Sequence, residues 1–268
     1  MISGISVLVR GVGEVGSAVA VALYRAGYAV ALHDEPRPAT LRRGMAFADT
    51  VFKGSTILDG LVAQWAESTA EFTAILAAGL VIPISTGPLP ELCRAAKWST
   101  IIDARMRKRA FPEHQRGSAP LTIGLGPNFI AGVNVDLAVE TSWGERLGAV
   151  VERGPTLPLI GEPQALGGIG RARFIYAPVT GRFETSMRIG DRVERDALVA
   201  SIATTALCAP IAGILRGLTH DGVWVTLRTK VVEVDPRGDP AAAFGLGLRP
   251  RRIAAGVLQA MARVSVPA

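Results

Sequence analysis

The chain has 268 residues, of which 49% are hydrophobic and 6% aromatic, and its 29 basic and 23 acidic residues give a formal net charge of +6. This length suits two domains, or one large domain, with an aliphatic core. The positive charge suits an anionic ligand or an acidic partner protein. The basic residues are scattered and not interleaved with aromatic ones, so we expect no nucleic-acid binding. The two basic runs, 105–109 and 249–252, are interpreted as solvated loops.

The sequence carries no sign of a membrane or secreted protein. The first predicted strand begins within a few residues of Met1, with no signal peptide before it. The longest apolar run, from Phe72 to Ile84, is too short to span a bilayer. The two cysteines, Cys93 and Cys208, lie far apart and lack metal-ligand spacing. We therefore expect a cytoplasmic protein with reduced thiols, no metal site and no membrane contact.

The most informative motif is the glycine turn, residues 11–16, with the sequence Gly-Val-Gly-Glu-Val-Gly. It follows an apolar run and precedes a segment of small and apolar residues, which predicts a strand, a turn and a helix. The first glycine permits a tight turn, the second lets backbone N–H groups approach a diphosphate, and the third lets helix and strand pack closely. The helix N-terminus favours an anion there. The predicted cofactor-binding residues of this motif are Gly11, Gly13, Glu14, Val15 and Gly16.

An acidic residue follows the next predicted strand. That strand, residues 28–33, ends at Asp34, about twenty residues after the glycines. An acid at this position can hydrogen-bond a ribose hydroxyl, which favours NAD over NADP. Arg37, Arg42 and Arg43 follow closely and offer a 2′-phosphate site instead. Because similar glycines serve only packing in some related folds, the turn alone leaves the ligand open.

Strands and helices alternate through the first half of the chain. The predicted helices are 71–78 and 89–96. The predicted strands are 80–84, 100–103 and 121–124, with a further short strand at 50–52. This alternation predicts a parallel, doubly wound, Rossmann-like sheet. Such sheets bind ligands at the carboxyl ends of their strands. Four residues at or just beyond these ends join the predicted cofactor site: Asp103, Arg105, Gly124 and Gly126.

Asp103 and Arg105 admit two interpretations. In the first, Arg105 binds a phosphate while Asp103 orients it or binds a sugar hydroxyl. In the second, the two side chains form a local ion pair that involves no ligand. The sequence does not choose between them.

The third quarter of the chain contains an internal repeat. Residues 177–183 are echoed by 209–215, and 190–193 by 221–225. Short strands divided by Gly-Asp or Asp-Gly turns predict two similar units that form a flattened β-barrel. The pattern resembles the barrel-sandwich hybrid of biotinyl and lipoyl carrier domains. The hairpin between the halves, residues 201–208, contains no lysine, so no covalent biotin or lipoyl amide can form there.

These patterns predict an α/β protein in three parts. A Rossmann-like dinucleotide-binding domain covers residues 1–128, and connecting strands with a linker cover 129–171. A barrel-sandwich hybrid β domain with a C-terminal helix covers 172–268. The helix is predicted from apolar residues at helical spacing in 253–261.

Short motifs along the whole chain resemble a known family. They are Val-Arg-Gly-x-Gly-x-x-Gly at 9–16, Leu-Tyr-Arg-Ala-Gly at 23–27, Met-Ala-Phe-Ala at 45–48, Ile-Asp-Ala-Arg-Met at 102–106, Gly-Leu-Gly-Pro at 124–127, Glu-Thr at 140–141, Ala-Pro at 177–178, Leu-Arg-Gly-Leu at 215–218, Val-Asp-Pro-Arg-Gly at 234–238 and Gly-Val-Leu-Gln-Ala at 256–260. In this combination they resemble the YqeB-type family of selenium-dependent molybdenum hydroxylase accessory proteins nearly end to end. The Asp-Ala-Arg segment and the following glycine loop are also similar to the C-terminal Rossmann domain of XdhC-type xanthine dehydrogenase maturation factors.

The resemblance implies an accessory or maturation protein for a molybdenum hydroxylase. Its expected partners are that hydroxylase or its maturation factors, and its expected ligand is a dinucleotide such as the molybdenum cofactor or NAD(P). Molybdopterin cytosine dinucleotide contains a diphosphate, which a glycine turn holds by the same physics as it holds NAD. The alternative is an NAD(P)-dependent oxidoreductase or a cofactor-modifying enzyme of unknown substrate. Whether the chain is a monomer or a homo-oligomer is left open.

Three segments depart from the family pattern. Asn128 replaces a glycine, residues 142–145 replace Asn-Arg-Gly-His, and 247–251 replace Ser-Asp-Lys-Ala-Arg. The second change removes an arginine and a histidine, with Glu145 at the histidine position, and the third removes a lysine. If the missing histidine and lysine do chemistry in the relatives, this chain is either inactive or specialised for binding. The sequence contains neither a Gly-x-Ser-x-Gly motif nor a P-loop lysine motif, so it supports neither an acyl-transfer site nor an NTPase.

Overall fold

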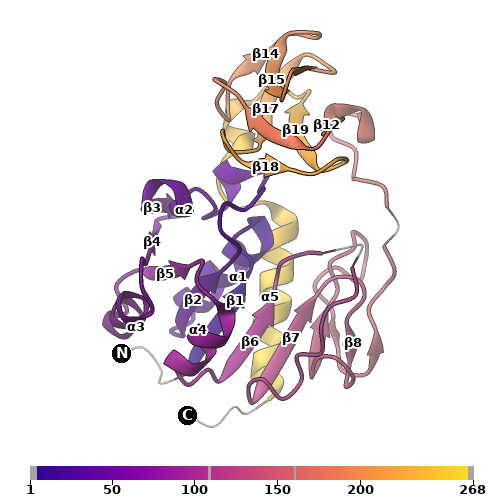
Figure 1. Ribbon diagram of the computed structural model, residues 1–268. Coiled ribbons are helices and arrows are strands. Elements are labelled where there is room, and N and C mark those ends of the chain that lie inside the picture. Colours follow the sequence, from indigo (N-terminus) through magenta and orange to yellow (C-terminus); the bar gives the residue numbers. More distant parts are fainter. Residues whose placement is uncertain (1–4, 108–109, 160, 265–268) are drawn as a thin grey trace.

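The computed structural model describes residues 5–107, 110–159 and 161–264 (Figure 1). Within these residues, nine strands form one main sheet, in the spatial order β10 (Val150–Val151), β9 (Leu137–Val139), β7 (Leu121–Leu125), β6 (Thr100–Asp103), β1 (Ser6–Arg10), β2 (Ala29–His33), β5 (Ile82–Ser85), β4 (Leu61–Trp65) and β3 (Ser55–Leu58). The described α-helices are α1 (Glu14–Arg25), α2 (Thr50–Lys53), α3 (Thr69–Ala78), α4 (Leu89–Ala95) and α5 (Leu248–Arg263). None of these helices combines the length and apolar character needed to cross a bilayer.

The main sheet is mixed rather than parallel. The strands from β9 to β4 run parallel to their neighbours, but β10 is antiparallel to β9 at one edge and β3 is antiparallel to β4 at the other. The predicted fold, a parallel Rossmann-like sheet followed by a barrel-sandwich hybrid, is therefore wrong. The chain reverses between β3 and β4 because Asp59 and Gly60 have φ values of 52° and 81°, as a tight two-residue hairpin requires. The predicted short strand at 50–52 lies in helix α2.

A second unit, here named the β unit, comprises residues 174–235. Its strands form two four-stranded antiparallel sheets, one with the order β12 (Phe174–Tyr176), β19 (Lys230–Asp235), β17 (Gly213–Leu218), β14 (Arg192–Val193), and the other with the order β16 (Thr205–Cys208), β15 (Leu198–Ile202), β13 (Gly181–Glu184), β18 (Trp224–Val225). A two-stranded sheet of β8 (Ile130–Ala131) and β11 (Gly154–Pro155) lies in the preceding segment. The β unit has its own core and lies above the main sheet in Figure 1.

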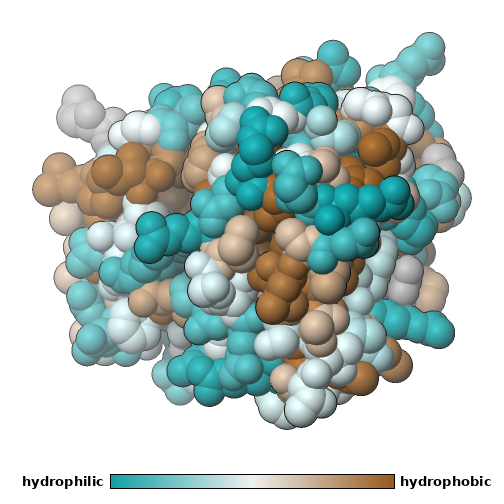
Figure 2. Space-filling view, turned by 90° about the horizontal axis from the view of Figure 1, so that it is seen from above, coloured by the Kyte–Doolittle hydropathy of each residue, from teal (hydrophilic) through white to brown (hydrophobic). Residues whose placement is uncertain are grey.

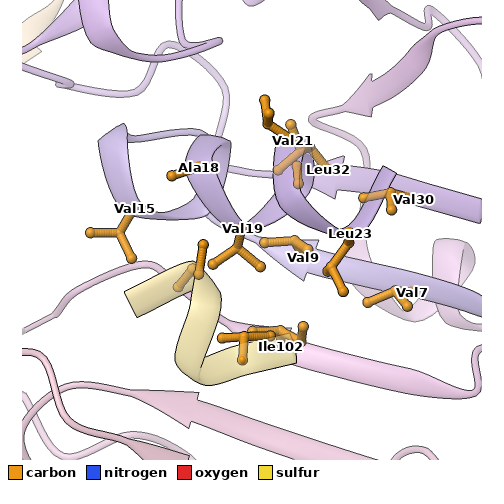
Figure 3. Close-up of a cluster of buried hydrophobic side chains, with 14 of the residues drawn as sticks. Val7, Val9, Val15, Ala18, Val19, Val21, Leu23, Val30, Leu32 and Ile102 are labelled. Atoms are coloured by element: carbon orange, nitrogen blue, oxygen red, sulfur yellow. The ribbon is translucent and has the colours of Figure 1, made fainter. Parts of the chain in front are cut away.

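Helix α1 packs on one face of the main sheet. Val7 and Val9 alternate with Leu8 along β1, so the two valines face α1 and the leucine faces the opposite side. Val19 and Leu23 of α1 lie in the same buried cluster as the two valines (Figure 3). Leu8 instead joins the cluster that contains residues of α3 and α4, so helices cover both faces.

Helix α5 returns from the β unit to the main sheet and packs beside α1 (Figures 1 and 3). Ile253 and Val257 are fully buried in the same core cluster as α1. A Cβ atom at Gly256 would lie 2.0 Å from the carbonyl oxygen of Gly148, so only glycine lets α5 approach the loop before β10. The predicted boundaries group this helix with the β domain and place β9 and β10 in a connecting segment. In the structure, β9 and β10 belong to the main sheet, and α5 packs in the core of that sheet beside α1.

The surface of the β unit is not one continuous apolar face. Its exposed large apolar side chains include Leu198, Trp224 and Leu227. In Figure 2, which is seen from above, hydrophobic patches are interrupted by hydrophilic side chains. Scattered exposed apolar residues of this kind are normal for protein surfaces.

Candidate functional site

A cavity of about 800 Å³ lies between the main sheet, the β unit and the start of α5. Its volume falls in the range of small-molecule binding sites. It opens beyond the carboxyl end of β1, which pairs with β2 on one side and with β6 on the other. Such a switch in strand order is where open α/β sheets bind ligands. Its wall includes the glycine turn and Asp34 from the main-sheet layer, Arg173 and Arg216 from the neighbourhood of the β unit, and Arg249 from α5.

The structure gives a different reason for glycine at each of the three positions in the turn. Gly11 has a φ of 115°, and a Cβ atom there would lie 2.8 Å from the backbone of Ala104. A Cβ atom at Gly16 would lie 1.9 Å from the carbonyl oxygen of Gly11, so this glycine allows close contact between α1 and β1. Gly13 has a φ of −68°, and a Cβ atom there would have no neighbour within 4 Å among the described residues. Its missing side chain therefore leaves space open to the cavity.

The N-terminus of α1 faces the cavity without a side-chain cap. Gly13 is the N-cap residue, and no side chain of the described residues caps the first turn. The first N–H groups of a helix have no partners within the helix, and the dipole makes this end positive. The arrangement therefore favours an anion near Gly13.

Asp34 holds the glycine turn in place. Its Oδ2 accepts a hydrogen bond from the backbone N–H of Val12 at 2.7 Å, and its Oδ1 accepts one from the N–H of Glu35 at 2.8 Å. Burial raises the pKa of the Asp34 carboxyl, although these two hydrogen bonds partly oppose that shift. The residue lines the cavity, so the carboxylate predicted to meet a ribose also orders the turn.

Arg42 connects the glycine turn to the β unit. Its Nη1 donates to the Glu14 carboxylate at 2.8 and 3.1 Å, while its Nε and Nη2 donate to Glu233 at 2.6 and 3.1 Å. Burial alone would raise the pKa of Glu14, but the charge and hydrogen bonds of Arg42 hold it below its usual value. Glu14 lines the cavity, and its carboxylate is engaged by this arginine.

Arginines outnumber carboxylates at the centre of this wall. The cluster of described side chains comprises Arg42, Arg173, Arg216, Arg237 and Arg249, which lie around Glu14, Glu233 and Asp235. This cluster has five positive and three negative charges, and the cavity is also lined by Arg105, Lys230, Asp34, Glu35 and Glu162. The sequence pattern indicated Arg42 for a 2′-phosphate but did not indicate the others. Arg216 lies in the Leu-Arg-Gly-Leu motif, and Arg249 lies in the basic run that was interpreted as a solvated loop.

Asp103 and Arg105 form an ion pair within a local network. Asp103 is buried, and its carboxylate accepts hydrogen bonds from Arg105 Nε at 3.0 Å and from Gln115 Nε2 at 2.7 Å. Arg105 also donates to Glu113 at 2.6 Å. Burial would raise the pKa of Asp103, but Arg105 holds it below its usual value. Arg105 lines the cavity, yet two carboxylates already engage its guanidinium.

The predicted cofactor residues separate into two groups. The described residues that line the cavity are Gly11, Gly13, Glu14, Val15, Asp34 and Arg105. The others, Gly16, Asp103, Gly124 and Gly126, do not line it. Gly124 instead makes room for the ring of Phe129, which would lie 2.2 Å from a Cβ atom there. The carbonyl oxygen of Gly126 accepts a hydrogen bond from Thr156 Oγ1 at 2.7 Å.

Metal-ligating side chains do not gather anywhere in the described residues. No group of three or more His, Cys, Asp or Glu side chains in this part of the chain is placed to hold a metal ion. Cys208 is an exposed thiol at the end of β16, and Cys93 is a partly buried thiol in α4.

Protonation of the clustered carboxylates should destabilise the protein in acid. Burial would raise the pKa of Glu233, but Arg42, Arg216 and Arg173 hold it below its usual value, and the pKa of Glu14 is lowered in the same way. Groups with a depressed folded-state pKa contribute stability that is complete above the unfolded value of about 4.3 and is lost as pH falls through the folded value. We expect a steady melting temperature from pH 8 to about 5 and a steep fall below about pH 4. A melting temperature that rises between pH 5 and pH 3 would contradict this.

Solved structures give only weak similarity. An aspartoacylase family protein from Mesorhizobium loti matches with a TM-score of 0.26 and 11% identity, over 87% of this chain and 85% of that chain. A succinylglutamate desuccinylase/aspartoacylase from Rhodobacter sphaeroides matches over the same shares with a TM-score of 0.26 and 17% identity. Similarity at this level supports no inference about fold or activity.

Sequence comparison gives a stronger relationship. No protein-family model matches the chain. The uncharacterized protein YqeB of Escherichia coli (strain K12) is 34% identical over 255 residues, which cover 95% of this chain and 47% of that protein. This similarity supports the predicted resemblance to YqeB-type proteins. The chain is thus similar to YqeB along almost its whole length and spans about half the length of that relative.

Proposed function

We propose that this chain is an accessory protein that binds a phosphate-bearing dinucleotide in the cavity, with the diphosphate at the glycine turn. One observation carries the proposal: the uncapped N-terminus of α1 faces a cavity whose wall holds an excess of arginine charge. Helix N-terminal N–H groups and arginines both favour phosphate, and here they lie at the same cavity.

The residues around the cavity fit such a ligand. The open space at Gly13 admits a phosphate close to the backbone. Asp34 lies at the adjoining strand end, where a carboxylate can also accept a hydrogen bond from a ribose hydroxyl. Arg42 lies at the helix start, where its guanidinium is 2.8 Å from the Glu14 carboxylate.

The resemblance to YqeB-type and XdhC-type proteins extends this proposal to a biological role. In this extension, the ligand is molybdopterin cytosine dinucleotide, and the partner is a molybdenum hydroxylase, including the selenium-dependent kind, or one of its maturation factors. NAD(P) is the alternative ligand, because it contains the same diphosphate. Mass spectrometry of material that stays bound through native purification would identify the ligand directly. Recovery of NAD(P) would favour the oxidoreductase alternative, and recovery of a pterin dinucleotide would favour the accessory role.

The substitution Gly13→Asp should abolish ligand binding without unfolding the protein. Its backbone has an ordinary φ of −68° with open space around the new side chain, and aspartate is a favoured N-cap residue. The carboxylate would take the N–H groups that a phosphate needs and repel it. We expect affinity for NAD and for CDP to fall roughly 100-fold, because like charges in contact cost several kcal/mol. Isothermal titration calorimetry measures this effect.

The matched control is Gly13→Ala, which adds a methyl group without charge. It should weaken nucleotide binding less than Gly13→Asp does, since the methyl group narrows the space for a phosphate but leaves the N–H groups unpaired. Both variants should melt within a few degrees of the original protein, as expected for a change of about 1 kcal/mol. If Gly13→Asp binds nucleotides normally, the glycine turn is not the binding site and the proposal is wrong.

A further inference from the structure

Two arginines of the cavity wall have no role in the proposed diphosphate site; we name them the arginine subsite. Arg216 lies on β17 in the β unit, and Arg249 lies in the first turn of α5. Both line the cavity, and their side chains are only 13% and 14% exposed. A cation in the first turn of a helix opposes the helix dipole, and this turn contains no acidic residue. Helix stability therefore does not explain Arg249.

Within the described part of the chain, neither guanidinium group makes a hydrogen bond to a carboxylate, and Arg216 also lies 3.9 Å from Asp235. The nearest carboxylate oxygen there lies 3.6 Å from Arg216, on Glu233, and 3.9 Å from Arg249, on Glu14. Both carboxylates are already bonded by Arg42, at 2.6 and 2.8 Å. Arg42 therefore forms the closer ion pair with each carboxylate. The two guanidinium groups of the arginine subsite are neutralised only in part by these carboxylates.

Neutral contacts position the two side chains without compensating their charge. Arg249 Nε donates to the carbonyl oxygen of Thr141 at 2.8 Å, and Arg216 Nε donates to that of Ala242 at 3.2 Å. Burial, together with the charge of nearby Arg42, lowers the pKa of both guanidinium groups. A buried cation without a hydrogen-bonded anion costs stability, so an anion supplied by a ligand would be stabilising here.

We infer that the arginine subsite binds a second anionic group of the ligand, a carboxylate or a phosphate on the half of the molecule beyond the diphosphate. This inference rests on the proposed function, because the diphosphate at the glycine turn sets where that half lies. The subsite selects against a distal half that is cationic, such as the oxidised nicotinamide ring of NAD. Because Arg216 belongs to the β unit and Arg249 to α5, the ligand would contact both parts of the molecule.

The experiment compares two nucleotide sugars, UDP-glucose and UDP-glucuronate. They share the nucleoside, the diphosphate and the sugar ring. UDP-glucose carries a hydroxymethyl group at the position where UDP-glucuronate carries a carboxylate. We expect UDP-glucuronate to bind the original protein at least about tenfold more tightly in isothermal titration calorimetry, because hydrogen bonds to charged groups are the stronger ones. This comparison needs no substitution, so it cannot fail through misfolding.

Three variants assign the preference to residues. Arg216→Gln and Arg249→Gln should each remove most of the preference for UDP-glucuronate while changing the affinity for UDP-glucose by about twofold or less, because only the carboxylate contacts the subsite. The control is Arg251→Gln in the same helix, whose exposed side chain pairs with Asp59. It should leave both affinities unchanged.

The outcomes separate this inference from the proposed function. If the original protein binds both sugars equally and Gly13→Asp loses both, the diphosphate site stands and the arginine subsite is wrong. If Arg216→Gln and Arg249→Gln weaken both sugars equally, the arginines hold the diphosphate and the inference is also overturned. If neither sugar binds the original protein, both proposals are wrong.

Discussion

Replacing Glu233 with glutamine should lower the free energy of unfolding by about 3–5 kcal/mol, the usual loss when one partner of a buried ion pair is removed. Glu233 on β19 is fully buried. Its carboxylate lies 2.6 Å from Arg42, 3.2 Å from Arg173 and 3.6 Å from Arg216. Glutamine has nearly the same shape but no charge, so three neighbouring cations would lose their shared anion.

Guanidinium denaturation followed by circular dichroism measures this loss. The matched control is Glu184→Gln on β13 in the same unit, where the carboxylate is 55% exposed and lies 3.8 Å from Arg182. Exposed pairs contribute about 0–1 kcal/mol, so this control should barely change stability. A loss below about 1 kcal/mol for Glu233→Gln would show that the cluster does not depend on its central carboxylate.

Gly16→Ala should destabilise the protein by about 3 kcal/mol or more, even though alanine is the better helix former. The new Cβ atom would lie 1.9 Å from the carbonyl oxygen of Gly11, and that contact is with backbone, which cannot rotate away. Helix α1 must then move off β1, at the centre of the main core. The gain of about 1 kcal/mol in helix propensity is too small to offset this.

The matched control is Gly13→Ala, which makes the same substitution in the same turn but brings the new Cβ atom into no backbone contact. The new methyl group would have no described atom within 4 Å, so we expect a change within about 1 kcal/mol. Thermal melts of the two variants measure the difference directly. Equal melting temperatures would mean that α1 does not approach β1 as closely as the structure has it.

Local sequence predicted the start of the chain well. The strand, glycine turn and helix at β1 and α1 lie where the motif placed them. The signal is local because a tight turn, a close backbone approach and a helix start each demand particular residues within a few positions. The buried strands β5, β6 and β7 were found for a similar reason, since their short apolar runs are bounded by turn residues.

The sheet edges and the position of the last helix were not predicted. The Asp59-Gly60 pair is a strong hairpin signal that would have predicted the β3–β4 reversal. The position of α5 had no comparable signal. Its apolar spacing predicts a helix with one buried face, but the same face could pack on the β unit or on α1. The contact at Gly148 that accommodates Gly256 is visible only in three dimensions.

By itself, the sequence determined the glycine turn, the acid after the second strand and the absence of a lysine on the β15–β16 hairpin, because each depends on residue type at one place. Only the tertiary structure decided which cations line the cavity. Arg42, Arg216 and Arg249 lie far apart along the chain and meet at one cavity. The sequence gives the number of charges but not the distances between them. In the folded protein these distances are a few ångströms, where Coulomb energies are large.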